Sequence, residues 1–167
     1  MDNEKKIMQK QSGFTLIEVM VVVAIVGIVT SIAVAGYLNW KPGYVFRGAV
    51  SQVRGDLNRA KMRAVETRRQ CRVSFTANGY IIEDGNRTMN SNQWGRINTN
   101  GVFVNGTPWK TISFDDYPQV SLSSITGNPV FSPRGTASQE SLQVNHPNAG
   151  GADVAVNITG RINITWL

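Results

Sequence analysis

The sequence predicts an α+β chain, in which a long N-terminal membrane helix continues into a second helical part packed on antiparallel β-sheet. Three observations carry this prediction: an apolar run that begins at Phe14, an amphipathic run near residues 46–69, and short β-type segments separated by turns after residue 70. The 167 residues suffice for one membrane segment and one globular domain of ordinary size. We therefore expect a membrane and assembly helix at residues 14–40 and a globular α+β domain at residues 41–167.

The apolar run at residues 14–37 is typical of a transmembrane helix. At about 1.5 Å per residue it spans about 36 Å, which exceeds the roughly 30 Å hydrocarbon core of a bilayer. Its one side chain that is charged at neutral pH is Glu18. A charge at the centre of a span costs roughly 2.5–3.5 kcal/mol on insertion scales and normally has a functional partner. A secretory signal peptide has a shorter apolar region that ends in a small-residue cleavage site, so we reject that alternative.

Small residues recur at four-residue spacing along this predicted helix, at Gly27, Ser31 and Ala35. They lie on one ridge, which suits close packing against other helices, although a lone anchor with incidental small residues is the alternative. Pro42-Gly43 follows and predicts an interruption of the helix, because proline removes a backbone donor and glycine loosens the chain.

A second helix is expected at about residues 46–69. Its apolar stripe recurs at spacings of three and four, which suits a helix that covers a sheet. The stripe consists of Phe46, Val50, Val53, Leu57, Ala60 and Ala64. Nine bases and two acids lie within residues 41–72, so the net charge of +6 belongs mainly to this segment. A solvated polar face is the ordinary explanation, and an acidic or nucleic-acid partner is the alternative.

The rest of the chain has the pattern of short strands and turns. Segments 71–76 and 80–83 flank Asn78-Gly79, a strong signal for a β-hairpin. Further strands are expected near residues 101–104, 110–114, 119–122, 128–131, 142–145, 153–158 and 161–166. Residues 84–100 and 146–151 are expected to be loops.

No residue pattern indicates catalysis, a metal or a cofactor, so we expect a protein that is not an enzyme. His146 lies in a Gly/Asn segment with no ligand at metal-binding spacing, which favours an exposed loop histidine. Asp115-Asp116 and Glu83-Asp84 lack the alternating oxygen ligands of a calcium loop and are interpreted as turn residues. Cys71 has no second cysteine to pair with and is expected to be a small apolar residue at the start of a strand.

The run Gly13-Phe14-Thr15-Leu16-Ile17-Glu18-Val19 resembles the N-terminal signal of type IV pilins and type II secretion pseudopilins. The resemblance implies a leader at residues 1–13, removed by a prepilin peptidase between Gly13 and Phe14, and methylation of the new amine at Phe14. It also implies that Glu18 acts in assembly with other pilin or pseudopilin subunits. The chain would cross the lipid of the bacterial inner membrane once, with its globular domain in the periplasm, and would be incorporated into a filament.

Two features depart from that family pattern. A leader of 13 residues is longer than the commonest short leaders, so we expect translation to begin at Met8 rather than at Met1. The proline that is usual in the middle of the first helix is missing, and Pro42 comes later.

The later segment Val130-Phe131-Ser132-Pro133-Arg134-Gly135-Thr136-Ala137, with Gly160-Arg161-Ile162 near the end, resembles the GspH/FimT group of minor subunits. Turns between strands are the ordinary explanation of the same residues. The group implies one of two functions. The favoured one is a minor pseudopilin of a type II secretion system, in a periplasmic filament that promotes protein export. The alternative is a FimT-like minor type IV pilin in pilus assembly and DNA uptake, in which Arg161 contacts DNA. Asn163 replaces the second arginine of that group's terminal motif, which argues against DNA binding.

Overall fold

The computed structural model describes residues 13–123 and 125–167, with the backbone but not the side chain of Ala35. The chain divides into two compact units, Met1–Trp40 and Lys41–Leu167. One helix, α1 (Leu16–Thr67), contributes to both. It begins after Thr15, whose Oγ1 accepts a hydrogen bond from the backbone N–H of Glu18 at 3.3 Å, as an N-cap residue does.

The part of α1 in the first unit is apolar and exposed. Every described side chain at residues 14–40 is exposed, including a long series of Val and Ile. Within the described part of the chain, α1 is the one helix long and apolar enough to cross a membrane. A membrane would cover this surface, because lipid is the solvent in which an unpartnered apolar helix is stable.

The predicted interruption at Pro42-Gly43 is wrong, because α1 continues through both residues. A proline inside a helix removes one backbone hydrogen bond, here the one that would reach the carbonyl of Leu38, at a cost of about 3 kcal/mol. Buried residues of the second unit hold the following turns. The helix ends at Thr67, after which Arg68 takes a left-handed conformation with φ of 54°.

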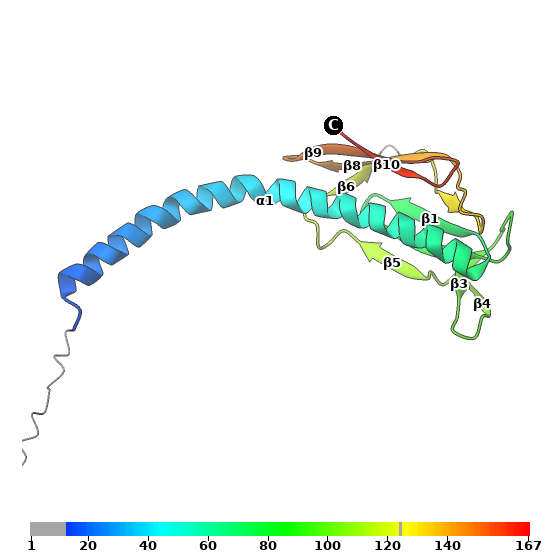
Figure 1. The fold of residues 1–167 in the computed structure, drawn as a ribbon, viewed down its shortest axis with the longest axis horizontal. Coiled ribbons are helices and arrows are strands. Elements are labelled where there is room, and N and C mark those ends of the chain that lie inside the picture. Colours follow the sequence, from blue (N-terminus) through cyan, green and yellow to red (C-terminus); the bar gives the residue numbers. More distant parts are fainter. Residues whose placement is uncertain (1–12, 124) are drawn as a thin grey trace, which may run out of the picture. The chain divides into compact units, whose positions relative to one another are not determined.

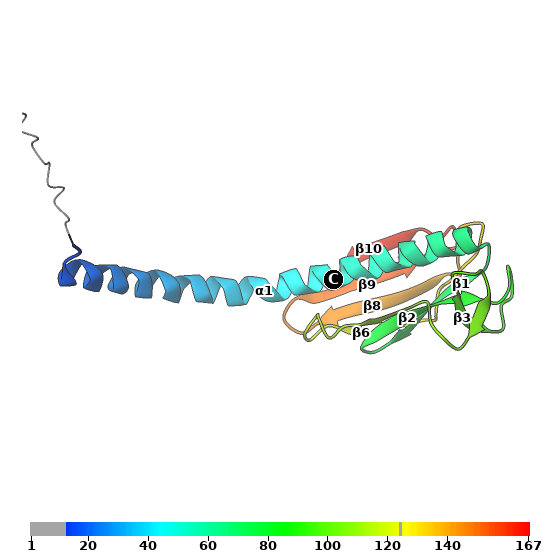
Figure 2. The same cartoon turned by 90° about the horizontal axis from the view of Figure 1, so that it is seen from below.

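The predicted apolar stripe on the second part of α1 is confirmed. Its members are buried and form the helical side of the core: Phe46, Val50, Val53, Leu57, Ala60 and Ala64. Within the second unit this part of α1 lies along the strands of two antiparallel sheets (Figures 1 and 2).

The first sheet has the order β4-β3-β2-β1-β7, with β5 paired to β2. Its strands are β1 (Cys71–Thr76), β2 (Gly79–Gly85), β3 (Trp94–Ile97), β4 (Phe103–Asn105), β5 (Lys110–Ser113) and β7 (Val130–Phe131). β1 and β2 form the predicted hairpin, with Thr76 opposite Gly79. The expected loop at residues 84–100 is partly wrong: β3 lies within it and pairs with β2 through Asp84 and Gly95.

The second sheet has the order β10-β9-β8-β6. Its strands are β6 (Ser121–Ser123), β8 (Glu140–His146), β9 (Gly150–Val156) and β10 (Ile162–Trp166). Strands β8 and β9 extend into the expected loop at residues 146–151 and leave a short hairpin turn. The two sheets meet where the backbone N–H of Leu122 donates to the carbonyl of Ala77 at 3.0 Å.

His146 is the clearest correction among single residues. It closes β8 with only 5% of its surface exposed, and its Nδ1 accepts a hydrogen bond from the backbone N–H of Asn148 at 3.1 Å. The expected exposed loop histidine is therefore wrong, because the tight β8–β9 turn folds the chain over the imidazole.

Candidate functional site

The N-terminal motif lies at the start of α1. Gly13, Phe14 and Thr15 precede the helix, and the Phe14 side chain is 83% exposed. The peptide bond between Gly13 and Phe14 is thus in an exposed, non-helical segment of the kind that proteases cut. Residues 1–12, which hold most of the expected leader and both Met1 and Met8, lie outside the described residues.

Glu18 lies in the first turn of α1, where its negative charge interacts favourably with the helix dipole. Its side chain is exposed, and no residue in the described ranges 13–123 and 125–167 forms an ion pair with it. A role in the helix start and a role in assembly are compatible, because the hydrogen bond to Thr15 uses only the backbone of Glu18.

The small-residue ridge lies on the exposed surface of α1. A Cβ at Gly27 would meet no described atom within 4 Å, and the Ser31 hydroxyl donates to the carbonyl of Ile28 at 2.7 Å. The side chain of Ala35 lies outside the description. Packing of this ridge against other helices therefore stays a prediction.

In the second unit, the carboxylate of Asp56 is the centre of a buried polar cluster. It accepts hydrogen bonds from Arg59 and Lys110, both at 2.8 Å, from the Tyr80 hydroxyl at 2.8 Å and from Gln52 at 2.7 Å. Burial alone would raise the pKa of Asp56, but the hydrogen bonds from Lys110, Tyr80 and Arg59 outweigh it and hold that pKa below its ordinary value. Burial and the bond to Asp56 raise the pKa of the Tyr80 hydroxyl.

Two further acids pair with the basic segment, on strand β2. The Arg63 guanidinium donates two hydrogen bonds to the Asp84 carboxylate, from Nε to Oδ1 at 3.1 Å and from Nη2 to Oδ2 at 3.0 Å. This bidentate pairing raises the pKa of Arg63. Glu83 accepts from Arg72 at 2.7 Å. Interpreting Glu83-Asp84 as turn residues was wrong: both are buried strand residues that neutralise arginines.

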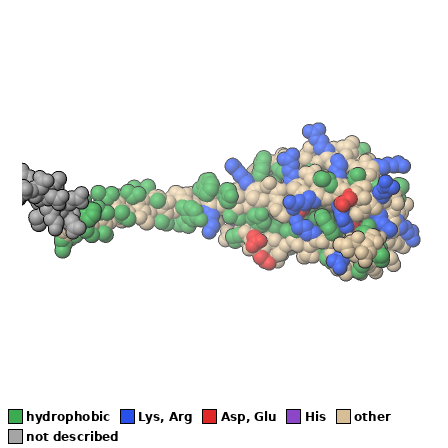
Figure 3. Space-filling view, turned by 60° about the horizontal axis from the view of Figure 1, so that its bottom comes forward, with side chains coloured by type: hydrophobic (Ala, Val, Ile, Leu, Met, Phe, Trp, Pro, Cys, Tyr) green, Lys and Arg blue, Asp and Glu red, His purple; other side chains and the backbone are tan. Residues whose placement is uncertain are grey.

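Internal pairing thus uses a substantial part of the basic segment at residues 41–72. On the face of the globular unit that Figure 3 displays, Lys and Arg side chains are scattered rather than gathered in one stripe. A nucleic-acid groove normally presents a continuous positive surface, and the displayed face does not present one.

The two segments of the GspH/FimT pattern come together in the fold. Gly160, with φ of 69°, lies so close to the turn at residues 132–135 that a Cβ there would collide with the carbonyl oxygen of Gly135. The Lys61 ammonium donates to the carbonyl of Gly160 at 3.1 Å and ties α1 to this contact. Arg134 and Arg161 are exposed beside it, one in each turn.

Cys71 is fully buried in the first residue of β1, which confirms the prediction of a small apolar residue at a strand start. Burial raises the pKa of its thiol. Within the described ranges, no three His, Cys, Asp or Glu side chains are arranged to hold a metal ion.

The sequence alone did not reveal the Asp56 cluster or the contact between Lys61 and Gly160. The only sequence signal for Asp56 was an acid within a strongly basic helix. No sequence signal indicated the role of Lys61, because its partner Gly160 is 99 positions away.

Together, the prepilin-type start, the long helix and the helix packed on antiparallel sheets define a subunit of the pilin class. The family model "Prokaryotic N-terminal methylation motif" matches residues 8–34, and the model "Type II transport protein GspH" matches residues 49–160. The second match covers well over half of the chain, and the chain belongs to the GspH family. The resemblance inferred from the sequence is confirmed.

Curated relatives include the type IV major fimbrial protein FimA of Dichelobacter nodosus. One form is 35% identical over 88 residues, which are 48% of this chain and 53% of the relative. Another is 46% identical over 57 residues, or 34% of this chain and 33% of the relative. The chain thus spans about half or less of these relatives.

Among solved structures, the type IV minor pilin FimU of Pseudomonas aeruginosa has a TM-score of 0.52 at 15% identity. The match covers 72% of this chain and 87% of that chain, and it confirms the predicted pilin-like fold. The chain is therefore a pilin-like subunit of the GspH family, with the pilin-like fold.

Proposed function

We propose that this chain is a minor pseudopilin of a type II protein secretion system, within a periplasmic filament that promotes protein export. The observation that carries the proposal is the match of residues 49–160, nearly the whole globular unit, to the type II transport family. The internal pairing of Arg59, Arg63 and Arg72 also supports a structural role for the basic segment.

The proposed maturation follows from the N-terminal motif. A prepilin peptidase cuts after Gly13, and the new amine at Phe14 is methylated. The exposed, non-helical backbone at these residues suits both reactions. The leader, residues 1–13, stays in the cytoplasm, and the domain at residues 41–167 is periplasmic.

Glu18 is then an assembly residue. Cleavage creates a positive charge at Phe14, and a carboxylate in lipid is stabilised by such a cation. In the filament that cation belongs to a neighbouring subunit, so each Glu18 is neutralised only when the subunit is incorporated.

A FimT-like minor pilin in DNA uptake is the second candidate. One observation favours it: Arg134 and Arg161 are exposed in adjacent turns, with Lys61 close by. Asn163, which is exposed at the position of the second arginine of the group's motif, argues against it.

Binding of double-stranded DNA to the full-length protein in detergent, measured at several salt concentrations, distinguishes the two functions. Phosphate contacts weaken steeply with salt. We expect no saturable binding at low salt, together with loss of protein export when the gene is deleted. Salt-sensitive binding that is lost in Arg161→Gln, but kept in the matched control Arg87→Gln, would overturn the secretion proposal in favour of DNA uptake.

A further inference from the structure

Strand β10 is the outer strand of the second sheet, and no strand among residues 13–123 and 125–167 pairs with its far edge. Its sequence, Ile162-Asn163-Ile164-Thr165-Trp166, has no charge, proline or glycine. Natural proteins usually protect such edges with lysine, proline, a bulge or a very short strand. Strand β10 uses none of these devices.

The hydrogen-bond pattern shows which backbone groups are available. The N–H of Leu167 donates to the carbonyl of Gly151 at 2.9 Å, and the N–H of Asn157 donates to the carbonyl of Arg161 at 3.0 Å. Because antiparallel strands alternate between paired and outward-facing residues, positions 161, 163, 165 and 167 face β9. The N–H and C=O groups of Ile162, Ile164 and Trp166 therefore point away from the sheet.

The other edge strands are shorter or carry charge. Strands β4 and β6 have three residues each and β7 has two. Strand β5 has four residues and begins with Lys110. Strand β10, with five residues, is thus the longest edge in the described part of the chain and has the least protection.

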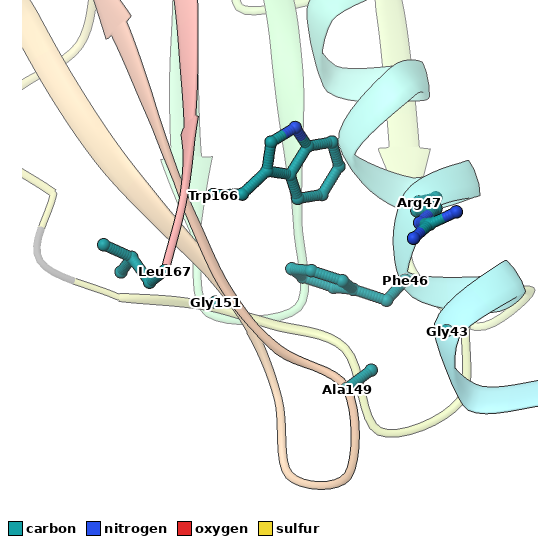
Figure 4. A pocket seen from close by; sticks show the side chains of 7 residues that line it. All are labelled: Gly43, Phe46, Arg47, Ala149, Gly151, Trp166 and Leu167. Carbon is teal, nitrogen blue, oxygen red and sulfur yellow. The ribbon is translucent and has the colours of Figure 1, made fainter. Parts of the chain in front are cut away.

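An open pocket of about 480 Å³ lies beside the end of β10 (Figure 4). Phe46 from α1 and Trp166 from β10 contact one another edge-to-face, with ring centroids 5.7 Å apart. The other lining residues are Gly43, Arg47, Ala149, Gly151 and Leu167. The Trp166 and Leu167 side chains are 54% and 66% exposed, so the pocket joins the edge to an apolar surface.

The two faces of β10 indicate the side chains that a partner would carry. Ile162 and Ile164 are buried or half-buried on the core side, whereas Asn163 and Thr165 are exposed on the other side. A strand paired with β10 has the same alternation, because side chains directly opposite one another lie on the same face. Its apolar side chains would extend the core, and one of them would reach the pocket.

We propose that the outer edge of β10 binds an extended, uncharged segment of another protein chain, which joins the second sheet as an additional strand. Backbone hydrogen bonds to Ile162, Ile164 and Trp166 supply the attraction, and the pocket beside Trp166 selects a bulky apolar side chain. The proposal does not depend on whether the filament serves secretion or DNA uptake.

A second copy of this chain, paired through its own β10, does not suit this edge. Two β10 strands related by a twofold axis run antiparallel, and the neighbouring part of α1 lies along β10 in both ribbon views (Figures 1 and 2). The parts of α1 within the two globular units would then run in opposite directions, whereas the subunits of one filament share one orientation, a premise that rests on the proposed function. The occupant is therefore a segment of a different chain.

The probe for this site is a synthetic peptide with the sequence of residues 162–167, acetylated and amidated at its ends and carrying a neutral polyethylene glycol tail for solubility. The peptide has the required alternation of apolar and polar side chains. It is not attached to a helix, so it can pair with β10 in either direction. With full-length protein in detergent, NMR amide exchange is measured with and without peptide. We expect exchange at Ile162, Ile164 and Trp166 to slow at least tenfold, while Asn163 and Thr165 change little. No slowing at millimolar peptide would overturn the proposal.

Ile164→Pro provides a second test, because it removes an outward-facing N–H without removing a hydrogen bond to β9. We expect peptide binding to weaken at least tenfold in this variant and to persist in the matched control Ile164→Val. Unchanged binding in a folded Ile164→Pro protein would contradict the proposal. If the proline variant does not fold, the exchange pattern of the unmodified protein decides the outcome.

Discussion

Asp56 shows how single charges organise the globular unit. It is a fully buried acid on a helix otherwise rich in bases, and its four partners come from α1, β2 and β5. Burying an ion pair adds little net stability, yet removing one member leaves the other charge uncompensated at a cost of several kcal/mol. The cluster therefore fixes which face of α1 meets the first sheet.

Replacing Asp56 with Asn should lower the free energy of unfolding by about 2–4 kcal/mol at pH 7, since Lys110 and Arg59 lose their shared counterion. The pKa of Asp56 is lower in the folded than in the unfolded protein, so its stabilisation is complete above about pH 4. That stabilisation disappears as the pH falls through the folded-state pKa. Urea unfolding at pH 7 and pH 3 measures both effects.

The matched control is Asp115→Asn, which removes an acid that is exposed in a turn. It should change the unfolding free energy by less than about 0.5 kcal/mol. Equal losses in the two variants, or the same pH dependence in the Asp56 variant as in the unmodified protein, would show that the buried pairing is not the cause.

If Glu18 has the assembly role proposed above, Glu18→Ala should give a protein that is cleaved and inserted but poorly incorporated into filaments, because the amine of the neighbouring subunit would lose its partner. Glu18→Asp keeps the charge and serves as the control. Pull-down of assembled filaments, followed by quantification of this chain, measures incorporation. Normal incorporation of Glu18→Ala would refute the assembly role.

The sequence singled out Glu18, whose role in assembly stays a prediction, and missed Asp56 for one physical reason. An acid alone in an apolar run is unusual without any knowledge of the fold. Asp56 lies among other charged residues, and the partners that make it unusual are Tyr80 and Lys110, which are 24 and 54 positions away.

At the scale of elements, the sequence predicted correctly those helices and hairpins whose contacting residues are close together along the chain. The helical stripe and the Asn78-Gly79 hairpin were predicted because their periodicity and turn chemistry are local. Strand β3 was missed although its partners β2 and β4 are close in sequence, because a strand of four residues lies within a segment rich in Asn, Gly and Arg, a composition typical of loops. The effect of Pro42 was overestimated, because the packing that keeps the following turns helical is tertiary.

The contact between the two GspH/FimT turns can be tested with a pair of glycine variants. Gly160 and Gly106 both have positive φ, at 69° and 73°, but only Gly160 faces a carbonyl oxygen that a Cβ would strike. Gly106→Ala should cost about 1 kcal/mol for the backbone conformation alone. Gly160→Ala should cost about 2–3 kcal/mol. Thermal unfolding compares the two variants, and equal losses would show that the turns are not in close contact.

At the scale of the whole molecule, the globular unit carries its own core. The buried hydrophobic residues that the structure describes run from Phe46 to Ile162, within the unit Lys41–Leu167. The exposed apolar side chains of α1 before Lys41 add nothing to this core.

A protein consisting of residues 41–167 should therefore fold by itself in water. We expect a cooperative urea transition, monitored by the fluorescence of Trp94, Trp109 and Trp166. Leu57→Ala in the same fragment should lower the unfolding free energy by about 2–4 kcal/mol, because Leu57 is 1% exposed. A transition without cooperativity would mean that the N-terminal part of α1 is needed for folding.

The position of Cys71 has a practical consequence for labelling. Thiol reagents react with the thiolate, and the one cysteine of this chain is both enclosed and resistant to ionisation. A cysteine introduced at an exposed site, such as Thr165 on β10, would react with a fluorophore or spin label, while the native Cys71 thiol would remain unlabelled. Distances and proximities to other subunits could then be recorded from a single probe, without first mutating the core.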